Sequence, residues 1–121
     1  MIQPIYLDYN GTTPHDPEVI AAMRPFFETE FGNPSSSHWY GIKPKQAVET
    51  ARKQVAGILN CEPTEVFFTS GGTESNNHAI RGVVLNSRHR PGGASSKAQI
   101  ITSAVEHPAV LEVCLWLREQ G

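Results

Sequence analysis

The chain has 121 residues and a formal net charge of −2, from 10 basic and 12 acidic residues. This balance gives no electrostatic case for binding nucleic acid or an anionic membrane surface. The length suits about one small domain, and no apolar run approaches the ~20 residues of a membrane span. Two cysteines, Cys61 and Cys114, are too few for a disulfide scaffold, so we expect a reducing compartment, the cytoplasm by default.

The first third of the chain predicts one strand and one helix separated by loops. Residues 5–9 have the pattern of a short strand, and residues 10–14 have the composition of a turn. The letters DPE at 16–18 are typical of a helix start. Pro25 is expected to kink this helix or to begin a second one, because proline removes a donor. Residues 32–37 form a clear break.

From residue 44 the pattern changes to alternating helices and strands. The predicted segments are, in order, a helix at 44–59, a strand at 66–70, a helix at 73–87, an exposed loop at 89–97, a strand at 99–104 and a helix at 108–119. Such alternation is typical of parallel strands joined by crossover helices, so an α/β fold is predicted. Three strands make a poor complete parallel sheet, so we expect an incomplete domain.

The stretch "VFFTSGGTESNNHAI", residues 66–80, joins a predicted strand to a predicted helix through two glycines. A helix N-terminus exposes unpaired N–H groups and partial positive charge, which suit an anion. Gly71 and Gly72 let a backbone turn sharply, and Thr73 adds a hydroxyl donor. The pattern is neither a dinucleotide fingerprint nor a P-loop. It indicates either a phosphate site or a plain glycine turn in which Thr73 caps the helix.

His107 follows the predicted strand at 99–104 and precedes the last helix. In an open α/β sheet, ligands bind outside the carboxyl ends of the strands, so His107 and the Gly72–Thr73 turn should lie at one edge. A neutral imidazole there can stack on an aromatic ligand or transfer a proton. The alternative is a histidine that only caps the helix. No histidine pair has the spacing of metal ligands, so no metal site is expected.

Five stretches together resemble the pyridoxal-phosphate-dependent cysteine desulfurases, which are class V aminotransferase-like enzymes of fold type I. They are "YLDYNGTTP", "FGNPSSSHWYG", "AVETARKQVAGILN", "VFFTSGGTESNNHAI" and "IITSAVEHPAVLEVC". They come in the family's order and spacing and run over essentially all of the chain. The selenocysteine lyases share most of these stretches and remain an alternative, as do other class V members.

The resemblance implies a role for several residues. Gly72 and Thr73 match the pair that holds the phosphate of pyridoxal 5'-phosphate. His107 matches the histidine that stacks on the pyridine ring and takes part in proton transfer, which makes it the catalytic candidate. The residues that match the substrate side are Asn10, Thr12 and Thr13 in the N-terminal loop and Asn33 in a loop near the active-site entrance. Gly11 stands where the family commonly has alanine, which leaves the shape of that loop in doubt.

The implied reaction removes sulfur from L-cysteine and gives L-alanine and an enzyme persulfide. The sulfur then passes to acceptor or scaffold proteins for iron–sulfur cluster or thiolated-cofactor assembly, and the family's enzymes are homodimers. The match covers the N-terminal third of the family's chain. Residues 1–40 correspond to the N-terminal arm and helix, and residues 41–121 begin the large cofactor-binding domain.

The catalytic groups that the family needs lie beyond the matched third. The lysines present, Lys43, Lys45, Lys53 and Lys97, do not stand in the family's Schiff-base context, and the two cysteines suit packing positions better than nucleophilic ones. The 121-residue chain alone is therefore expected to be inactive. An alternative of another class is a non-catalytic truncated protein that keeps this surface and binds a partner.

Overall fold

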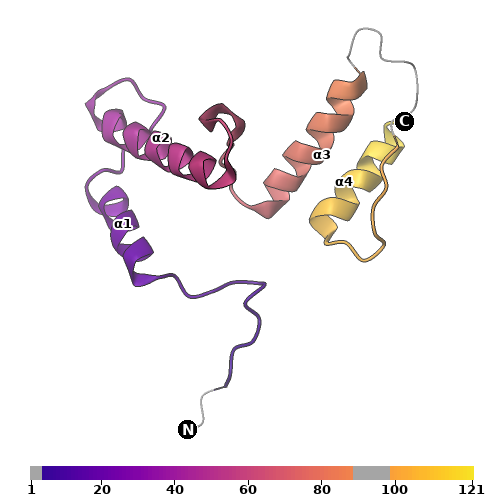
Figure 1. Cartoon of the computed structure of the whole chain (residues 1–121), viewed down its shortest axis with the longest axis horizontal. Helices are drawn as coiled ribbons and strands as arrows, with labels where there is room; N and C mark the ends of the chain where they lie inside the picture. The colour runs from indigo at the N-terminus through magenta and orange to yellow at the C-terminus, as the bar shows by residue number, and fades with distance from the viewer. Residues whose placement is uncertain (1–3, 89–98) are drawn as a thin grey trace. The chain divides into compact units, whose positions relative to one another are not determined.

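The computed structural model describes residues 4–88 and 99–121 (Figure 1). Its elements are α1 (Pro17–Glu28), α2 (Trp39–Leu59), the 3-10 helix η1 (Pro63–Glu65), α3 (Gly72–Arg88) and α4 (Pro108–Glu119). The chain divides into two compact units, Met1–Val66 and Phe67–Gly121. Among the described residues, no helix combines the length and the apolar character that crossing a membrane requires.

Helix α1 begins where the sequence predicts. Asp16 is its N-cap, and the Asp16 carboxylate accepts the backbone N–H of Glu18 at 2.7 Å. The second helix expected at Pro25 is wrong, because α1 continues through this residue to Glu28, and the kink stays a prediction. Pro25 instead acts at the helix end, where its carbonyl oxygen accepts the N–H groups of Thr29 at 2.9 Å and Glu30 at 2.7 Å.

Helix α2 begins at Trp39, before the predicted start at residue 44. The prediction placed Pro44 in the first turn, where a proline loses nothing. In the structure Pro44 is buried inside the helix and leaves the carbonyl oxygen of Tyr40 without its i+4 donor. The helix ends at Asn60, whose left-handed φ of 53° is tolerated by asparagine. The Arg52 guanidinium donates to the Val66 carbonyl and ties α2 to the segment that follows η1.

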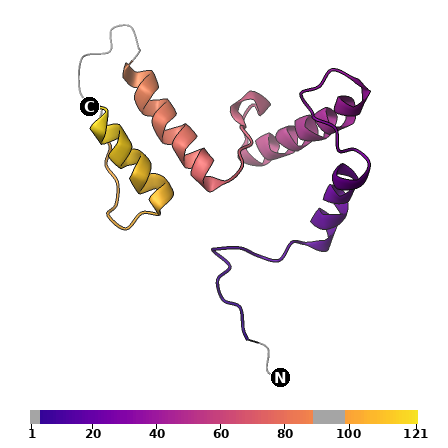
Figure 2. The same ribbon diagram turned by 180° about the vertical axis from the view of Figure 1, so that it is seen from behind.

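The second unit is a pair of helices. Both views show α3 and α4 side by side with their N-terminal ends at the same end of the pair (Figures 1 and 2). Val84 of α3 and Ala109, Val113 and Leu117 of α4 are the buried apolar residues of this unit. The spacing of the α4 residues, four apart, places them on one face of the helix. Both helices lie within one residue of their predicted bounds.

The segments predicted as strands, residues 5–9, 66–70 and 99–104, are not strands in this structure. All three lie in the described ranges, and these ranges contain no strand. The physical reason is that strand side chains and ladder hydrogen bonds need neighbouring strands, and two or three isolated segments supply too few. Apart from the buried Val66, their apolar side chains are largely exposed, as in Phe67, Phe68 and Ile101. The loop expected at residues 89–97 lies outside the described residues.

Candidate functional site

The turn that begins α3 contains backbone N–H groups that have no hydrogen-bond acceptor within the helix. The first hydrogen bond to the turn is from the N–H of Ser75 to the carbonyl of Gly71, at 3.1 Å. The N–H groups of Gly72, Thr73 and Glu74 precede it and have no acceptor within the helix. Together with the helix dipole they form a site that favours an anion.

The other side chains of this turn hydrogen-bond to one another. The Glu74 carboxylate oxygen accepts both the backbone N–H and the hydroxyl of Ser70, each at 2.7 Å. The hydroxyls of Thr69 and Ser75 lie 2.6 Å apart, and each lies 3.2 Å from the Gly71 carbonyl oxygen, so one hydroxyl can donate to the other while the second donates to that carbonyl. The Thr73 hydroxyl is outside this network and remains available to a ligand.

The bonds from Ser70, first from its hydroxyl and then from its N–H, lower the pKa of the Glu74 carboxyl below its ordinary value of 4.5. Glu74 is thus held as a carboxylate in the first turn of α3, where negative charge is favourable. Sequence reasoning missed this contact. The signal was present, because a serine four residues before a glutamate at a helix start is close to a capping-box pattern.

Open space surrounds the two glycines of the turn. A Cβ atom built at Gly71 or at Gly72 meets no atom of the protein within 4 Å. Packing of the described residues therefore requires no glycine at Gly72, whereas the φ of 159° at Gly71 favours glycine whatever the space around it. The geometry instead leaves the backbone N–H groups accessible to a group that approaches from outside.

His107 is the N-cap of α4. Its Nδ1 atom accepts the backbone N–H of Ala109 at 3.0 Å, which is the helix-capping role that the sequence left as an alternative. Because Nδ1 is an acceptor, the neutral imidazole carries its proton on Nε2. The ring is exposed, so capping leaves its faces and its Nε2 edge free to contact a ligand.

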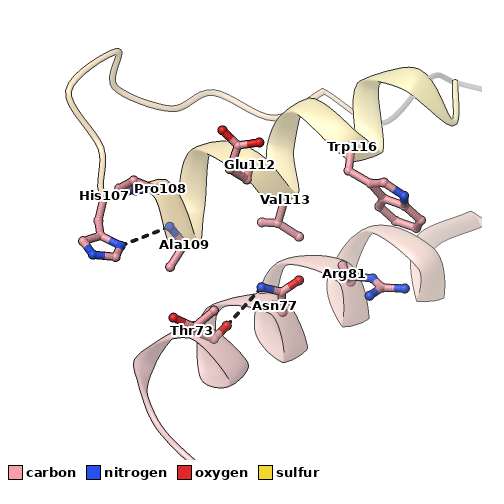
Figure 3. Close-up of a pocket in the computed structure, with 9 residues that line it drawn as sticks. All are labelled: Thr73, Asn77, Arg81, His107, Pro108, Ala109, Glu112, Val113 and Trp116. Atoms are coloured by element: carbon pink, nitrogen blue, oxygen red, sulfur yellow. Dashed lines mark hydrogen bonds between the residues drawn. The ribbon is translucent and has the colours of Figure 1, made fainter.

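A groove runs between α3 and α4, and Thr73 and His107 lie at the same end of it (Figure 3). Its volume is about 460 Å³. At the other end the Arg81 guanidinium carbon lies 4.4 Å from the centre of the Trp116 ring, a cation–π contact between the two helices. The structure thus brings Thr73 and His107 to one end of the groove, and Gly72 directly precedes Thr73, while their role toward a cofactor stays a prediction.

The residues predicted for the substrate side belong to the other unit. Asn10 and Thr12 lie in an exposed turn in which the N–H of Gly11 donates to the Asp8 carbonyl at 3.0 Å. The Tyr6 hydroxyl closes the turn by donating to the carbonyls of Asp8 at 2.7 Å and Thr12 at 3.0 Å. Thr13 follows directly and is exposed. Tyr6 is a positioning residue that sequence reasoning did not single out.

Asn33 organises the second of these loops. Its side-chain oxygen accepts the N–H of Ser35 at 2.8 Å, and its carbonyl accepts the N–H of Ser36 at 3.0 Å. The side chain is thus used in shaping its own turn, as asparagine often is. The ring of Tyr40 stacks on that of Phe31 with centres 6.2 Å apart, which fixes the loop against the start of α2.

The remaining candidates show no built site. Cys61 and Cys114 are free thiols of intermediate exposure. Among the described residues, no group of three or more histidine, cysteine, aspartate or glutamate residues could hold a metal ion. Lys43 pairs with Glu30 in the first unit, and Lys97 lies outside the described residues.

Residues 5–121 match the aminotransferase class-V family, and the chain belongs to this family. It is 48% identical over 122 residues to the "Cysteine desulfurase IscS" of Dictyoglomus turgidum, covering 100% of this chain and 29% of that protein. It is 49% identical over 118 residues to the "Cysteine desulfurase, mitosomal" of Encephalitozoon cuniculi, covering 97% and 26%.

A solved structure is also similar to the chain. It is called "NIFS-LIKE PROTEIN", and it matches with a TM-score of 0.84 and 39% identity. The match covers 98% of this chain and 31% of that structure. The chain therefore spans less than a third of the length of these relatives.

Proposed function

We propose that these residues form the N-terminal part of a pyridoxal-phosphate-dependent cysteine desulfurase and supply its phosphate cradle and ring-stacking histidine. The observation that carries the proposal is the shared end of the α3–α4 groove. Gly72 and Thr73 offer open backbone donors there, and His107 presents its ring beside them. Relatives named cysteine desulfurase, at 48% and 49% identity, support the reading.

The residues present fit the cofactor at its phosphate end. A phosphate dianion needs several N–H or O–H donors, and the helix start offers three backbone N–H groups and the Thr73 hydroxyl. The space around Gly72, where a Cβ would meet no protein atom, lets the anion approach the backbone. When bound, the cofactor supplies an electron sink for carbanion chemistry.

The chain's own residues would bind and orient that group. Thr73 and the N–H groups beside it would hold the phosphate, and the exposed imidazole of His107 would cover the ring. The bond from Ala109 to Nδ1 fixes the ring orientation, so the proton that His107 can exchange sits on Nε2. In unit 1, Asn10, Thr12, Thr13 and Asn33 are proposed for the substrate side.

The proposed overall reaction takes L-cysteine and an enzyme thiol to L-alanine and an enzyme persulfide. The substrate's C–S bond breaks, a new S–S bond forms, and the substrate carbon gains the proton that completes the methyl group. The thiol and the Schiff-base lysine would come from residues outside this match. The persulfide sulfur would pass to acceptor or scaffold proteins, and the working enzyme would be a homodimer in the cytoplasm.

The extended segments are proposed as strands of the fold type I sheet in the complete protein. Residues 99–107 run back along α4 to its N-terminal end, the direction that a strand takes between two parallel crossover helices (Figures 1 and 2). In this arrangement residues 1–40 would form the N-terminal arm and residues 41–121 would begin the large domain. The exposed rings of Phe67 and Phe68 would then be covered by the rest of the sheet.

The test is a comparison of substrates with the full-length protein loaded with the cofactor. We expect equal amounts of alanine and persulfide sulfur from L-cysteine. Alanine from L-selenocysteine with none from L-cysteine would instead identify a selenocysteine lyase. Binding of a desulfurase protomer without any turnover would identify the non-catalytic alternative.

A second test uses the 121-residue chain with added cofactor, borohydride and peptide mass spectrometry. We expect no stoichiometric adduct, because the chain's four lysines, Lys43, Lys45, Lys53 and Lys97, do not match the family's Schiff-base position. A single specific adduct on any of them would contradict the assignment of the reactive lysine to residues outside this match.

A further inference from the structure

We infer that Glu74 is a positioning residue, which holds the α3 turn open for the cofactor phosphate by gripping Ser70; this inference rests on the proposed function. The Glu74 carboxylate makes two hydrogen bonds of 2.7 Å, and both go to the residue just before the glycine pair. The contact joins the two sides of the turn, so Gly71, Gly72 and Thr73 are bracketed between its ends.

A second pair of side chains, those of Thr69 and Ser75, also joins the two sides of the turn. Thr69 and Ser75 bracket Ser70 and Glu74, and their hydroxyls lie 2.6 Å apart. Both hydroxyls lie 3.2 Å from the Gly71 carbonyl oxygen, which also accepts the backbone N–H of Ser75 at 3.1 Å. The backbone carbonyl that would repel a phosphate is therefore occupied, while the N–H groups of the next three residues stay unpaired within the helix.

Charge alone predicts the opposite role for Glu74. A carboxylate in the first turn lies near the anion and opposes its binding, so deleting the charge should strengthen binding. If Glu74 positions the turn, removing its hydrogen bonds with Ser70 weakens phosphate binding, because a preorganised set of donors loses its alignment. The two effects change the affinity for phosphate in opposite directions, so two substitutions at Glu74 can distinguish them.

Glu74→Gln removes the charge and keeps an oxygen that can accept both bonds from Ser70. Glu74→Ala removes the charge and the grip together. If Glu74 positions the turn, the glutamine variant binds the phosphate as well as the parent or better, and the alanine variant binds it less well. If Glu74 acts only through its charge, both variants bind more tightly than the parent.

The experiment measures the dissociation constants of pyridoxal 5'-phosphate and of pyridoxal for the full-length protein by calorimetry. The ratio of the two constants isolates the phosphate contribution. We expect Glu74→Ala to lower this preference about tenfold, the lower end of the losses seen when outer-shell contacts around a bound metal are removed. Glu119→Ala, at the far end of α4, is the matched control and should leave the ratio unchanged.

Ser70→Ala provides the second variant in case Glu74→Ala does not fold. It removes the hydroxyl but keeps the backbone N–H bond to Glu74, so we expect about a threefold loss of phosphate preference, as for one ordinary hydrogen bond. An unchanged or raised preference in the variants that lose the grip would overturn the inference. A parent protein with no preference for the phosphate form would overturn the proposed function instead.

Discussion

Two helix starts in this chain use glycine for opposite reasons. Beside the start of α2, a Cβ atom at Gly41 would overlap the Ser36 carbonyl oxygen and come within 2.8 Å of that of Asn33. At the start of α3, a Cβ atom at Gly71 or Gly72 would meet no protein atom within 4 Å. The first glycine is required by the chain's own packing. Packing sets no such requirement at the second pair, although the φ of 159° at Gly71 itself favours glycine.

The difference shows which glycine the packing of the described residues requires and which it does not. A glycine lowers helix stability by roughly 0.5–1 kcal/mol relative to alanine, so an unneeded one at a helix start has a cost. At Gly72 the compensation that we propose is a group outside the described residues. A phosphate held by the N–H groups of Gly72 and Thr73 is such a group.

The largest expected effect breaks the packed helix start. Gly41→Ala should lower the free energy of unfolding by roughly 2 kcal/mol, because the new methyl group would push into backbone that cannot move aside. Gly57→Ala is the control in the same helix, where a Cβ meets no atom within 4 Å, and it should raise stability by about 0.5–1 kcal/mol. Urea denaturation measures both. Changes of the same sign in the free energy of unfolding of the two variants would contradict the distinction between a packed and an open glycine.

The second effect concerns the open glycine. Gly72→Val should leave the melting temperature nearly unchanged, because its side chain enters empty space. It should weaken pyridoxal 5'-phosphate binding by tenfold or more, roughly the factor that 1.4 kcal/mol produces, because the side chain stands where the anion approaches. Calorimetry with the full-length protein measures the affinity. Unchanged affinity would show that the phosphate binds elsewhere.

The helices could be predicted from sequence because their signals are local. Asp16 and Pro17 mark the start of α1, and the ends of α3 and α4 follow from apolar spacing and caps. The start of α2 could not, since Pro44 reads as a first-turn residue and only packing against the preceding loop places it inside the helix. The described residues contain no strand for a related reason, and the strands of the complete protein stay a prediction. Their apolar pattern requires neighbours, and those neighbours are not among the described residues.

The candidate site likewise combines residues that the sequence predicts with a contact that the sequence analysis missed. Gly72, Thr73 and His107 could be found from the resemblance and from their place after predicted strands, and the structure brings them to one end of a groove. The hydrogen bonds between Ser70 and Glu74 were missed although the sequence carries a signal for them, because a carboxylate at a helix start has several possible donors. Whether unit 1 completes the site with Asn10 stays a prediction.

The third effect separates the two roles of His107. His107→Ala should destabilise α4 by about 1 kcal/mol, because the cap on the Ala109 N–H is lost. His107→Asn should restore most of that stability, since the asparagine side-chain oxygen can replace Nδ1 as the acceptor. Both variants lack the ring and should lose turnover equally. Full turnover in the asparagine variant would show that His107 only caps the helix.

The fourth effect is at the far end of the groove. Arg81→Met should lower the free energy of unfolding by about 0.5–1 kcal/mol through loss of the cation–π contact with Trp116. Arg81→Lys should lose less, because the ammonium group can still lie over the ring. Denaturation followed by Trp116 fluorescence measures the change. Equal losses in both variants would mean that the guanidinium contributes packing and not charge.

The smallest effect is a pH dependence of the α3 turn. The pKa of Glu74 is lowered in the folded protein by the Ser70 hydroxyl, then by the Ser70 N–H, with His78 adding a smaller charge effect. A lowered folded-state pKa means that the carboxylate contributes stability above its ordinary value of 4.5 and loses it as the pH falls through the lowered value.

In Ser70→Ala the pKa of Glu74 should rise toward 4.5, as carbon-detected NMR titration of the Glu74 carboxyl would show. Ser37→Ala, in the other unit, should leave that titration unchanged. An identical Glu74 titration in Ser70→Ala and the parent would mean that the hydroxyl does not hold the carboxylate, and the grip would then rest on the Ser70 backbone alone.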